Sequence, residues 1–310
     1  MNLKTFVLAA ALLAAALPAA ADTAALRIVD DTGHEVVLAQ PARRIVSLAP
    51  HLTELVYAAG AGDQLVAVGK YSDFPPEALS KPVISDAFAV NYEALEQLKP
   101  DLVLMWGSGT PERTKSKLRT LGVPVYEIEV RSVDELAGTL RNIGRLAGTE
   151  SVAQARAQAI EHDWAALKST YSGRRPVRVF FQLWDAPLMT LSGQHLISSA
   201  IAACGGANVF GEVPTLTATV SWEAAVKRDP ELVLTAGSPG EPAKPGRWAE
   251  FPQVSATRRG EFGRIEGNLI ARSGPRFVDG ARELCEAIDR ARQGLPQLVI
   301  PAATAASTAR

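Results

Sequence analysis

The chain has 310 residues, with 32 Lys and Arg against 33 Asp and Glu, and 47% of its residues are hydrophobic. These proportions are typical of one large or two medium folded domains, and they exclude a disordered, collagen-like or many-span membrane protein. The formal net charge of -1 provides no basic surface for a nucleic-acid backbone. Nucleic acid is therefore not an expected partner.

Residues 1–21 have the three parts of a secretory signal peptide. A lysine supplies the positive charge, residues 6–17 are apolar, and Ala19 and Ala21 are the small residues that precede a cleavage site. This apolar run is shorter than the roughly 20 residues needed to cross a bilayer. No cysteine near the cleavage site could carry a lipid, so we expect the mature chain to be free in the periplasm.

The first half of the chain alternates short apolar runs with helical patterns. Residues 43–50 predict a strand and residues 51–59 the helix that follows it. Residues 101–106, DLVLMW, are typical of a buried parallel strand and come after a helix that Asn91 caps. This alternation predicts a doubly wound α/β lobe at residues 22–148.

The second half repeats a segment of the first. YEALEQLKPDLVLM, which begins at Tyr92, aligns without a gap with WEAAVKRDPELVLT, which begins at Trp222. An internal match of this kind predicts a second α/β lobe of similar build, at residues 174–292. Glu93 and Glu223 occupy equivalent positions in the two segments.

A single long helix is predicted between the lobes, at residues 149–173, with Thr149 as its cap and Gly173 as its stop. At 1.5 Å per residue it would be roughly 34 Å long, a rigid connection that allows little lobe movement; an ordinary crossover helix is the alternative. Residues 293–310 end in PAATAASTAR and are expected to be a disordered tail. The apolar face of the helix follows spacings of three and four residues: Ala153, Ala157, Ile160, Trp164, Leu167 and Tyr171.

The two cysteines, Cys204 and Cys285, are expected to form a disulfide, because an exported chain matures in an oxidising compartment. Their separation of 81 positions corresponds to about 4.5 kcal/mol of constraint on the unfolded chain in the chain-entropy model. Two reduced, buried thiols are the alternative.

No enzyme motif is found in the sequence, which lacks GxSxG, HExxH, a P-loop and a glycine fingerprint after a strand. His51 and His195 lie at predicted helix starts and could face a cleft, but no second ligand stands at the spacing of a metal site. We therefore predict that the chain is not an enzyme and holds no metal or cofactor of its own.

Aromatic residues follow several of the predicted strands, and open α/β sheets bind ligands at the carboxyl ends of their strands. Aromatic rings there would stack on a large flat ligand, while neighbouring polar groups would hydrogen-bond its edges. The predicted ligand-binding residues are Tyr71, Ser72, Asp73, Phe88, Trp106, Trp184, Asp185 and Arg272.

Several segments together resemble a known family. SLAPHLTELVYAAGAGDQLVAV, YSDFPPEA and KPDLVLMW, followed by CGGANVF and ELC, are similar to the periplasmic cobalamin-binding proteins over about residues 43–292. The resemblance implies a class III periplasmic binding protein, with two α/β lobes bridged by one helix. Such a protein holds cobalamin, its transported ligand, between the lobes and delivers it to the permease dimer of an ABC importer. We expect a monomer.

The resemblance also implies roles for single residues. Tyr71 and Trp106 match positions that contact the corrin ring. Glu93 and Glu223 match glutamates on the lobe surfaces that dock onto arginines of the permease. The helix dipole would favour a glutamate at either position by about 0.3 to 1 kcal/mol without any partner.

Two aromatic residues of the family are missing, near Ala87 and Leu269, which leaves the class of ligand open. A haem or ferric-siderophore binder of the same fold is the alternative, and Tyr71 or His51 would then be the axial ligand of haem. A secreted enzyme on a similar scaffold is a more remote alternative, for which the sequence offers no pair of nucleophile and base.

Overall fold

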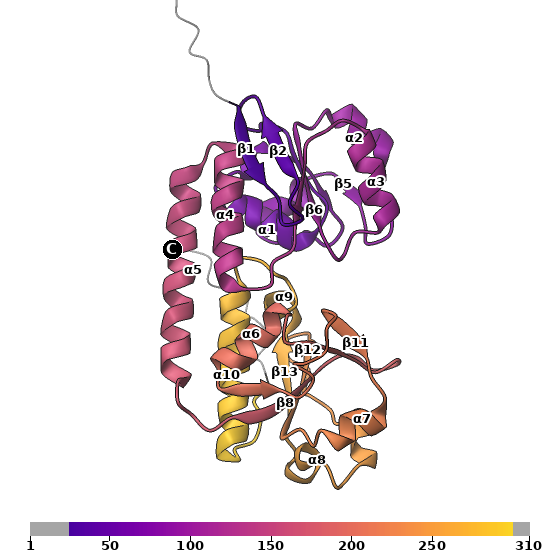
Figure 1. Cartoon of the computed structure of the whole chain (residues 1–310), viewed down its shortest axis with the longest axis vertical. Helices are drawn as coiled ribbons and strands as arrows, with labels where there is room; N and C mark the ends of the chain where they lie inside the picture. The colour runs from indigo at the N-terminus through magenta and orange to yellow at the C-terminus, as the bar shows by residue number, and fades with distance from the viewer. Residues whose placement is uncertain (1–24, 300–310) are drawn as a thin grey trace, which may run out of the picture.

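The computed structural model describes residues 25–299, and the predicted signal peptide lies outside this range. The described residues form two α/β lobes stacked along one long helix, α5 (Glu150–Tyr171), which confirms the predicted architecture (Figure 1). Between residues 25 and 299, no helix combines the length and the apolar character needed to cross a bilayer.

The N-terminal lobe is built on a sheet of five parallel strands in the order β5-β4-β3-β6-β7. From β3 the chain winds toward one edge of the sheet, and from β6 it winds toward the other edge. The crevice beyond the carboxyl ends of β3 and β6 is therefore the switch point at which such sheets bind ligands. The strands are β3 (Ile45–Ser47), β4 (Leu65–Gly69), β5 (Val83–Ser85), β6 (Leu102–Trp106) and β7 (Val125–Ile128).

Helices cover both faces of this sheet, because successive side chains of each strand point to opposite faces. Ile45 packs in one core with α1 and α4, and Val46 packs in another core with α2 and α3. An antiparallel hairpin, β1 with β2, adds to the first core. The elements are β1 (Leu26–Val29), β2 (Glu35–Leu38), α1 (Pro50–Ala58), η1 (Gly62–Gln64), η2 (Pro76–Ser80), α2 (Tyr92–Leu98), α3 (Glu112–Thr120) and α4 (Val133–Ala147).

The sheet of the C-terminal lobe is mixed and not a copy of the first. β8, β10, β12 and β13 pair in parallel, whereas β9 is antiparallel to β8 and β11 is antiparallel to β9. Only residues 185–188 connect β8 to β9, and so short a connection joins antiparallel neighbours. The strands are β8 (Val177–Trp184), β9 (Met189–Leu191), β10 (Gly206–Asn208), β11 (Thr217–Thr219), β12 (Leu232–Gly237) and β13 (Phe262–Glu266).

The repeated segment is present in both lobes as a capped helix followed by a strand: α2 with β6, and α7 with β12. The side chains of Asn91 and Ser221 accept the backbone N–H of the third residue after each, at 3.0 and 3.1 Å. This confirms the predicted repeat and its cap. The helices of the second lobe are α6 (Leu196–Ala203), α7 (Trp222–Lys227), η3 (Gly246–Glu250), α8 (Ser255–Arg259), α9 (Gly267–Ile270) and α10 (Phe277–Gln293).

The long helix α5 contacts α1 and α4 in the first lobe and α6 and α10 in the second. Its predicted apolar face is buried or half-buried, and it belongs to one continuous core that extends into both lobes. Gly144 allows close packing of α4, because a Cβ at that position would clash with Ala153 of α5. The helix is therefore packed along its length and is not a free linker.

Two expectations about chain ends are corrected in part. Thr149 occupies the N-cap position of α5 as predicted, but its side chain accepts no capping hydrogen bond: its φ and ψ of -123° and 32° are not extended, and its N–H donates to Gly144 O at 2.8 Å. The tail is ordered as far as residue 299, since Gln293 ends α10 and the Nε2 of Gln297 donates to Glu261 Oε2 at 2.7 Å. The rest of the expected tail lies outside the described residues.

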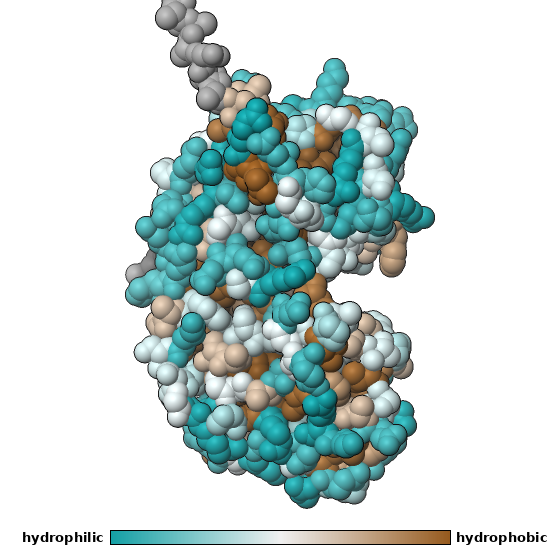
Figure 2. Space-filling view, in the orientation of Figure 1, coloured by the Kyte–Doolittle hydropathy of each residue, from teal (hydrophilic) through white to brown (hydrophobic). Residues whose placement is uncertain are grey.

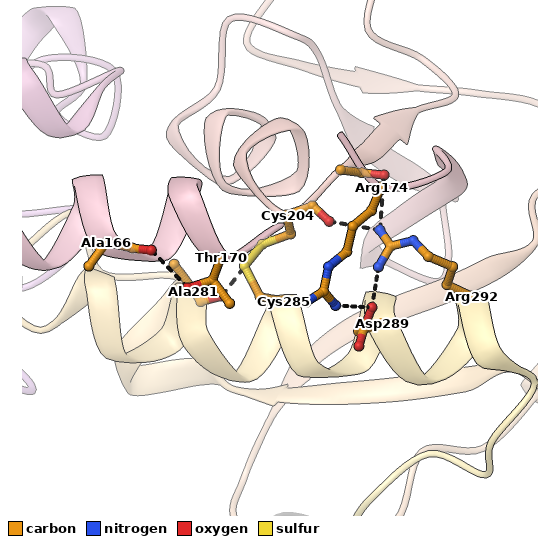
Figure 3. Close-up of a disulfide and its surroundings, with 9 residues drawn as sticks. Ala166, Thr170, Arg174, Cys204, Ala281, Cys285, Asp289 and Arg292 are labelled. Atoms are coloured by element: carbon orange, nitrogen blue, oxygen red, sulfur yellow. Dashed lines mark hydrogen bonds and ion pairs between the residues drawn. A yellow bond between two sulfur atoms is a disulfide. The ribbon is translucent and has the colours of Figure 1, made fainter. Parts of the chain in front are cut away.

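The predicted disulfide joins Cys204, at the end of α6, to Cys285 in the middle of α10 (Figure 3). Beside it, Asp289 accepts from Arg174 and Arg292, and Arg292 Nη2 also donates to Cys204 O at 2.9 Å. The disulfide and these ion pairs fix the end of α6 and the start of the second lobe to α10.

Candidate ligand-binding site

A cleft separates the two lobes on the side opposite α5, and Figure 2 shows it as a notch in the molecular surface. At its base, a cavity of about 360 Å³ is lined by residues of both lobes, among them Trp106 and Glu129 from the first and Leu183 and His195 from the second. A smaller cavity of about 140 Å³ lies on the first lobe and also includes Trp106. The two cavities therefore meet at the carboxyl end of β6, which is at the switch point of the sheet.

Four aromatic side chains are exposed: Tyr71 by 70%, Phe88 by 76%, Trp106 by 39% and Trp184 by 64%. No other aromatic side chain among residues 25–299 is exposed. Tyr71 and Phe88 lie shortly after β4 and β5, respectively. Trp106 is the last residue of β6, and Trp184 is the last residue of β8. Large apolar side chains grouped on a surface mark a place where another molecule binds. Tyr71, Phe88 and Trp106, which line one cavity, are therefore candidate ligand contacts, and Trp184 is a further candidate from the second lobe.

Tyr71 is held in an unusual backbone conformation, with φ at 66°. A residue other than glycine adopts this conformation at a cost in free energy, so its surroundings must stabilise it. Its carbonyl oxygen accepts from Arg272 Nη2 at 3.3 Å, and Lys70 Nζ lies 5.2 Å from its ring centroid. The exposed ring is therefore presented on a loop of defined shape.

The indole of Trp106 is supported by His51, whose ring lies edge-on at a centroid distance of 5.1 Å. His51 is 6% exposed, and its burial, together with the positive charge of Arg272, lowers its pKa to about 4. The imidazole is thus neutral at pH 7. Its position behind Trp106 makes it a support for the indole and disfavours it as an axial ligand for haem.

His195 begins α6 and lines the interlobe cavity. Its Nδ1 accepts from the backbone N–H of Ile197 at 3.1 Å, and burial lowers the pKa of the imidazole to about 4. In the neutral ring the proton must then be on Nε2. This nitrogen is therefore a candidate hydrogen-bond donor at the cavity.

Ser72 does not have the position expected of a ligand contact. It is 6% exposed, and its Oγ lies 2.9 Å from Thr53 Oγ1, which in turn is 2.9 Å from Ser47 Oγ. These three hydroxyls form a buried chain that ties the Tyr71 loop to α1. The predicted contact at Ser72 is therefore corrected to a role inside the lobe.

Asp73 and Arg272 pair with each other instead of facing the cleft as free groups. Arg272 Nη1 lies 2.6 Å from Asp73 Oδ1, and this hydrogen bond lowers the pKa of the Asp73 carboxyl. Arg272 also pairs with Glu54 Oε1 at 2.9 Å. Asp185 remains exposed, with Gln182 Nε2 at 3.4 Å from its Oδ1.

The predicted docking residues, Glu93 and Glu223, are both exposed at the second position of a repeat helix, α2 in one lobe and α7 in the other. They lie away from the cavities described above, whose lining residues do not include them.

Sequence reasoning missed Glu54, Arg276 and the cavity residue Glu129. Glu54 is 1% exposed, between Thr53 and Leu55 in a buried stretch of α1. A single carboxylate in an apolar helix must find a partner when it is buried, and this was the available signal. For residues 25–299, no group of three or more metal-binding side chains is found.

Comparison with known proteins shows the class to which the chain belongs. Residues 45–256 match the family model described as periplasmic binding protein, and the chain belongs to this family. The vitamin B12-binding protein of Vibrio cholerae is 34% identical over 246 residues, which cover 79% of this chain and 88% of that protein. That of Pectobacterium carotovorum is 32% identical, over 78% of this chain and 87% of that protein.

Solved structures agree with this result. The crystal structure of the periplasmic vitamin B12-binding protein BtuF of Vibrio cholerae matches with a TM-score of 0.73 and 32% identity, and the match covers 82% of this chain and 99% of that chain. The periplasmic heme-binding protein RhuT of Roseiflexus sp. RS-1 matches with a TM-score of 0.68 at 22% identity, which shows a shared fold alone.

Proposed function

We propose that this chain is a periplasmic substrate-binding protein that captures cobalamin between its lobes and delivers it to an ABC importer. One observation carries the proposal: all four exposed aromatic side chains of residues 25–299 lie at the ends of strands or in the loops that follow them, and three of them line the cavities of the cleft. Similarity to vitamin B12-binding proteins over most of the chain supports the identity of the ligand.

The chemistry of cobalamin fits the groups of the cleft. A corrin is a large, nearly flat ring with apolar faces and amide side chains at its edge. Tyr71, Phe88, Trp106 and Trp184 would cover its faces, since aromatic rings supply large contact areas at low entropic cost. The Nε2–H of His195 would donate to an amide oxygen, and Asp185 would accept from an amide nitrogen.

Docking to the importer is proposed to use Glu93 and Glu223. Their exposure and their equivalent places in the two lobes provide two matched negative points, suited to the two similar halves of a permease dimer. In this proposal residues 1–21 direct export of the chain, which acts as a monomer. The protein releases its ligand chemically unchanged and needs no resident cofactor.

The docking proposal predicts that Glu93→Arg and Glu223→Arg stop cobalamin uptake through the cognate importer but leave the affinity for cobalamin unchanged. Glu96→Arg is the matched control, since Glu96 is exposed on the same helix as Glu93. Equal uptake by all three variants would contradict docking by the two glutamates.

Titration calorimetry of the mature chain, from Asp22, with cyanocobalamin and in parallel with haemin, tests the ligand. Tight one-to-one binding of cyanocobalamin, with no heat from haemin, is the expected result. Binding of haemin without binding of cyanocobalamin would show that haem, and not cobalamin, is the ligand of this protein.

A further inference from the structure

The carboxylate of Glu54, on α1 of the first lobe, is held by two arginines of the second lobe. Arg276 binds it in a bidentate manner, with Nε 2.9 Å from Oε2 and Nη2 2.7 Å from Oε1. Arg272 Nη1 lies 2.9 Å from Oε1. Because Glu54 is only 1% exposed, moving the lobes apart would leave a buried charge without a partner, which is strongly unfavourable.

Both arginines belong to the connection between α9 and α10, residues 271–276. This connection is itself tied to the long helix, because Arg156 Nη2 of α5 donates to Pro275 O at 3.3 Å. The two guanidinium groups are mostly covered, with 14% and 18% of their side chains exposed. They therefore reach the first lobe from a fixed base and are not mobile surface groups.

The same two arginines hold the loop that carries the exposed Tyr71. Arg272 Nη1 pairs with Asp73 Oδ1 at 2.6 Å, and its Nη2 donates to the carbonyl oxygen of Tyr71 at 3.3 Å. The guanidinium of Arg276 lies 3.9 Å from the ring centroid of Phe74. Residues 71–74 of the first lobe are thus held in place by side chains of the second.

We propose that Glu54, Arg272 and Arg276 form an interlobe clasp that positions the Tyr71 loop for ligand binding. The cluster of Glu54 and Asp73 with the two arginines is balanced in charge, so Arg272 has no free charge to offer a ligand. The clasp makes the shape of the loop depend on the second lobe. This inference takes the identity of the ligand from the proposed function, whereas the contacts of the clasp are independent of that function.

The clasp is tested first without ligand, by amide hydrogen exchange of the mature protein. In Arg272→Met, which keeps an unbranched, flexible side chain but removes the guanidinium group and its charge, residues 71–74 should exchange about tenfold faster, while exchange in α10 stays as in the wild type. Arg282→Met is the matched control, since Arg282 lies on α10 and, within residues 25–299, its ion-pair partner is the exposed Asp279. Unchanged exchange at residues 71–74 in Arg272→Met would overturn the proposal.

Asp73→Asn is a milder second variant, because the Asp73 side chain is 49% exposed and the amide has nearly the same shape, so the lobe is expected to stay folded. It should accelerate exchange at residues 71–74 in the same direction but to a smaller extent. No acceleration would contradict a clasp that acts through this ion pair. Arg272→Lys restores the charge but not the forked geometry, so it should recover part of the wild-type protection.

Calorimetry with cyanocobalamin then links the clasp to binding. If the binding-competent loop falls to about a tenth of the population in Arg272→Met, the apparent affinity falls about tenfold. Weaker binding with unchanged loop exchange would instead make Arg272 a direct ligand contact and refute the positioning role. If the wild type binds no cobalamin, the proposed function fails, and the exchange data still decide whether the clasp exists.

Discussion

The exposed aromatic residues at the strand ends are costly to leave in water, and a ligand that covered them would lower the free energy of the complex. Trp184 is the clearest example: it is 64% exposed at the end of β8, and it is supplied by the second lobe. Its proposed contribution to binding is therefore expected to be separable from its contribution to folding.

Replacing Trp184 by alanine is expected to lower the affinity for cobalamin about tenfold, equivalent to about 1.4 kcal/mol, because stacking and apolar contact are lost. Trp184→Phe should lose less, since a ring remains. Calorimetry measures both, and Val152→Ala, at a residue 51% exposed on α5, serves as the control. Equal affinity in wild type and Trp184→Ala would remove this residue from the site.

His195, which lines the interlobe cavity, is expected to make the free energy of unfolding depend on pH in the acid range. Its pKa is about 4 in the folded protein, against 6.5 for the ordinary group, so between these values the unfolded chain binds a proton that the folded protein does not. Stability from this residue is complete above pH 6.5 and is lost as the pH falls from 6.5 to 4. The loss is about 3 kcal/mol.

The variant His195→Asn removes the titrating group but keeps a good helix cap. Relative to the wild type, its free energy of unfolding should therefore fall less between pH 6.5 and 4, which urea denaturation at several pH values measures. Carboxyl groups that titrate in the same range affect both proteins alike. Parallel stability profiles would show that His195 has no such role.

At the level of elements, the repeated helix-strand units show that the same backbone is stabilised differently in each lobe. Lys99 and Asp229 both follow a repeat helix, with φ at 45° and 44°. Asp229, unlike Lys99 within residues 25–299, has side-chain partners: its Oδ1 accepts from Ser255 N at 2.7 Å, and its Oδ2 lies 2.9 Å from Arg178 Nη2.

Glycine substitution at these equivalent positions is expected to have opposite effects. Lys99→Gly should stabilise the protein by about 0.5 kcal/mol, because glycine adopts positive φ without strain. Asp229→Gly should destabilise it by about 1 to 3 kcal/mol, because the N–H and hydroxyl of the buried Ser255 lose their acceptor. Chemical denaturation measures both, and effects of the same sign would contradict this account.

For the whole molecule, two features hold the lobes in one orientation. A continuous apolar core runs through α5 into both lobes, and the Glu54 clasp joins the lobes through a second, polar contact. A wide hinge motion would have to expose part of this core to water. The lobes are therefore expected to change their relative orientation little when a ligand binds.

Small-angle scattering with and without cyanocobalamin measures this expectation. The radius of gyration of the mature chain should be nearly the same in both states, since both contacts between the lobes persist. A marked compaction on ligand addition would indicate a wide closure and would contradict the packing argument.

The disulfide stabilises the molecule without taking part in the cleft, because Cys204 is at the opposite end of α6 from His195. The double variant Cys204→Ala with Cys285→Ala should lose up to about 4.5 kcal/mol of stability, as expected for a closed loop of 81 residues. Its affinity for cobalamin, measured below its unfolding midpoint, should stay unchanged. A large loss of affinity at full folding would connect the disulfide to the site.

The sequence alone was sufficient for the features that depend on local pattern. The spacing of Ala153, Ala157 and Ile160 predicted the buried face of α5, because helical periodicity decides which side chains share a face. Asn91 was predicted as a helix cap because its side chain bonds a backbone N–H only three residues further on. Trp106 was placed at the sheet edge because the carboxyl ends of parallel strands lie together there.

Only the tertiary structure decided which polar groups are partners. Arg272 was predicted as a ligand contact but pairs with Glu54 and Asp73, which are 218 and 199 positions away in the chain. Ser72 bonds Thr53 inside the lobe, at a separation of 19 positions. An ion pair forms between any opposite charges that folding brings together, so its members carry no local signal, whereas helix periodicity and strand alternation are properties of neighbouring residues.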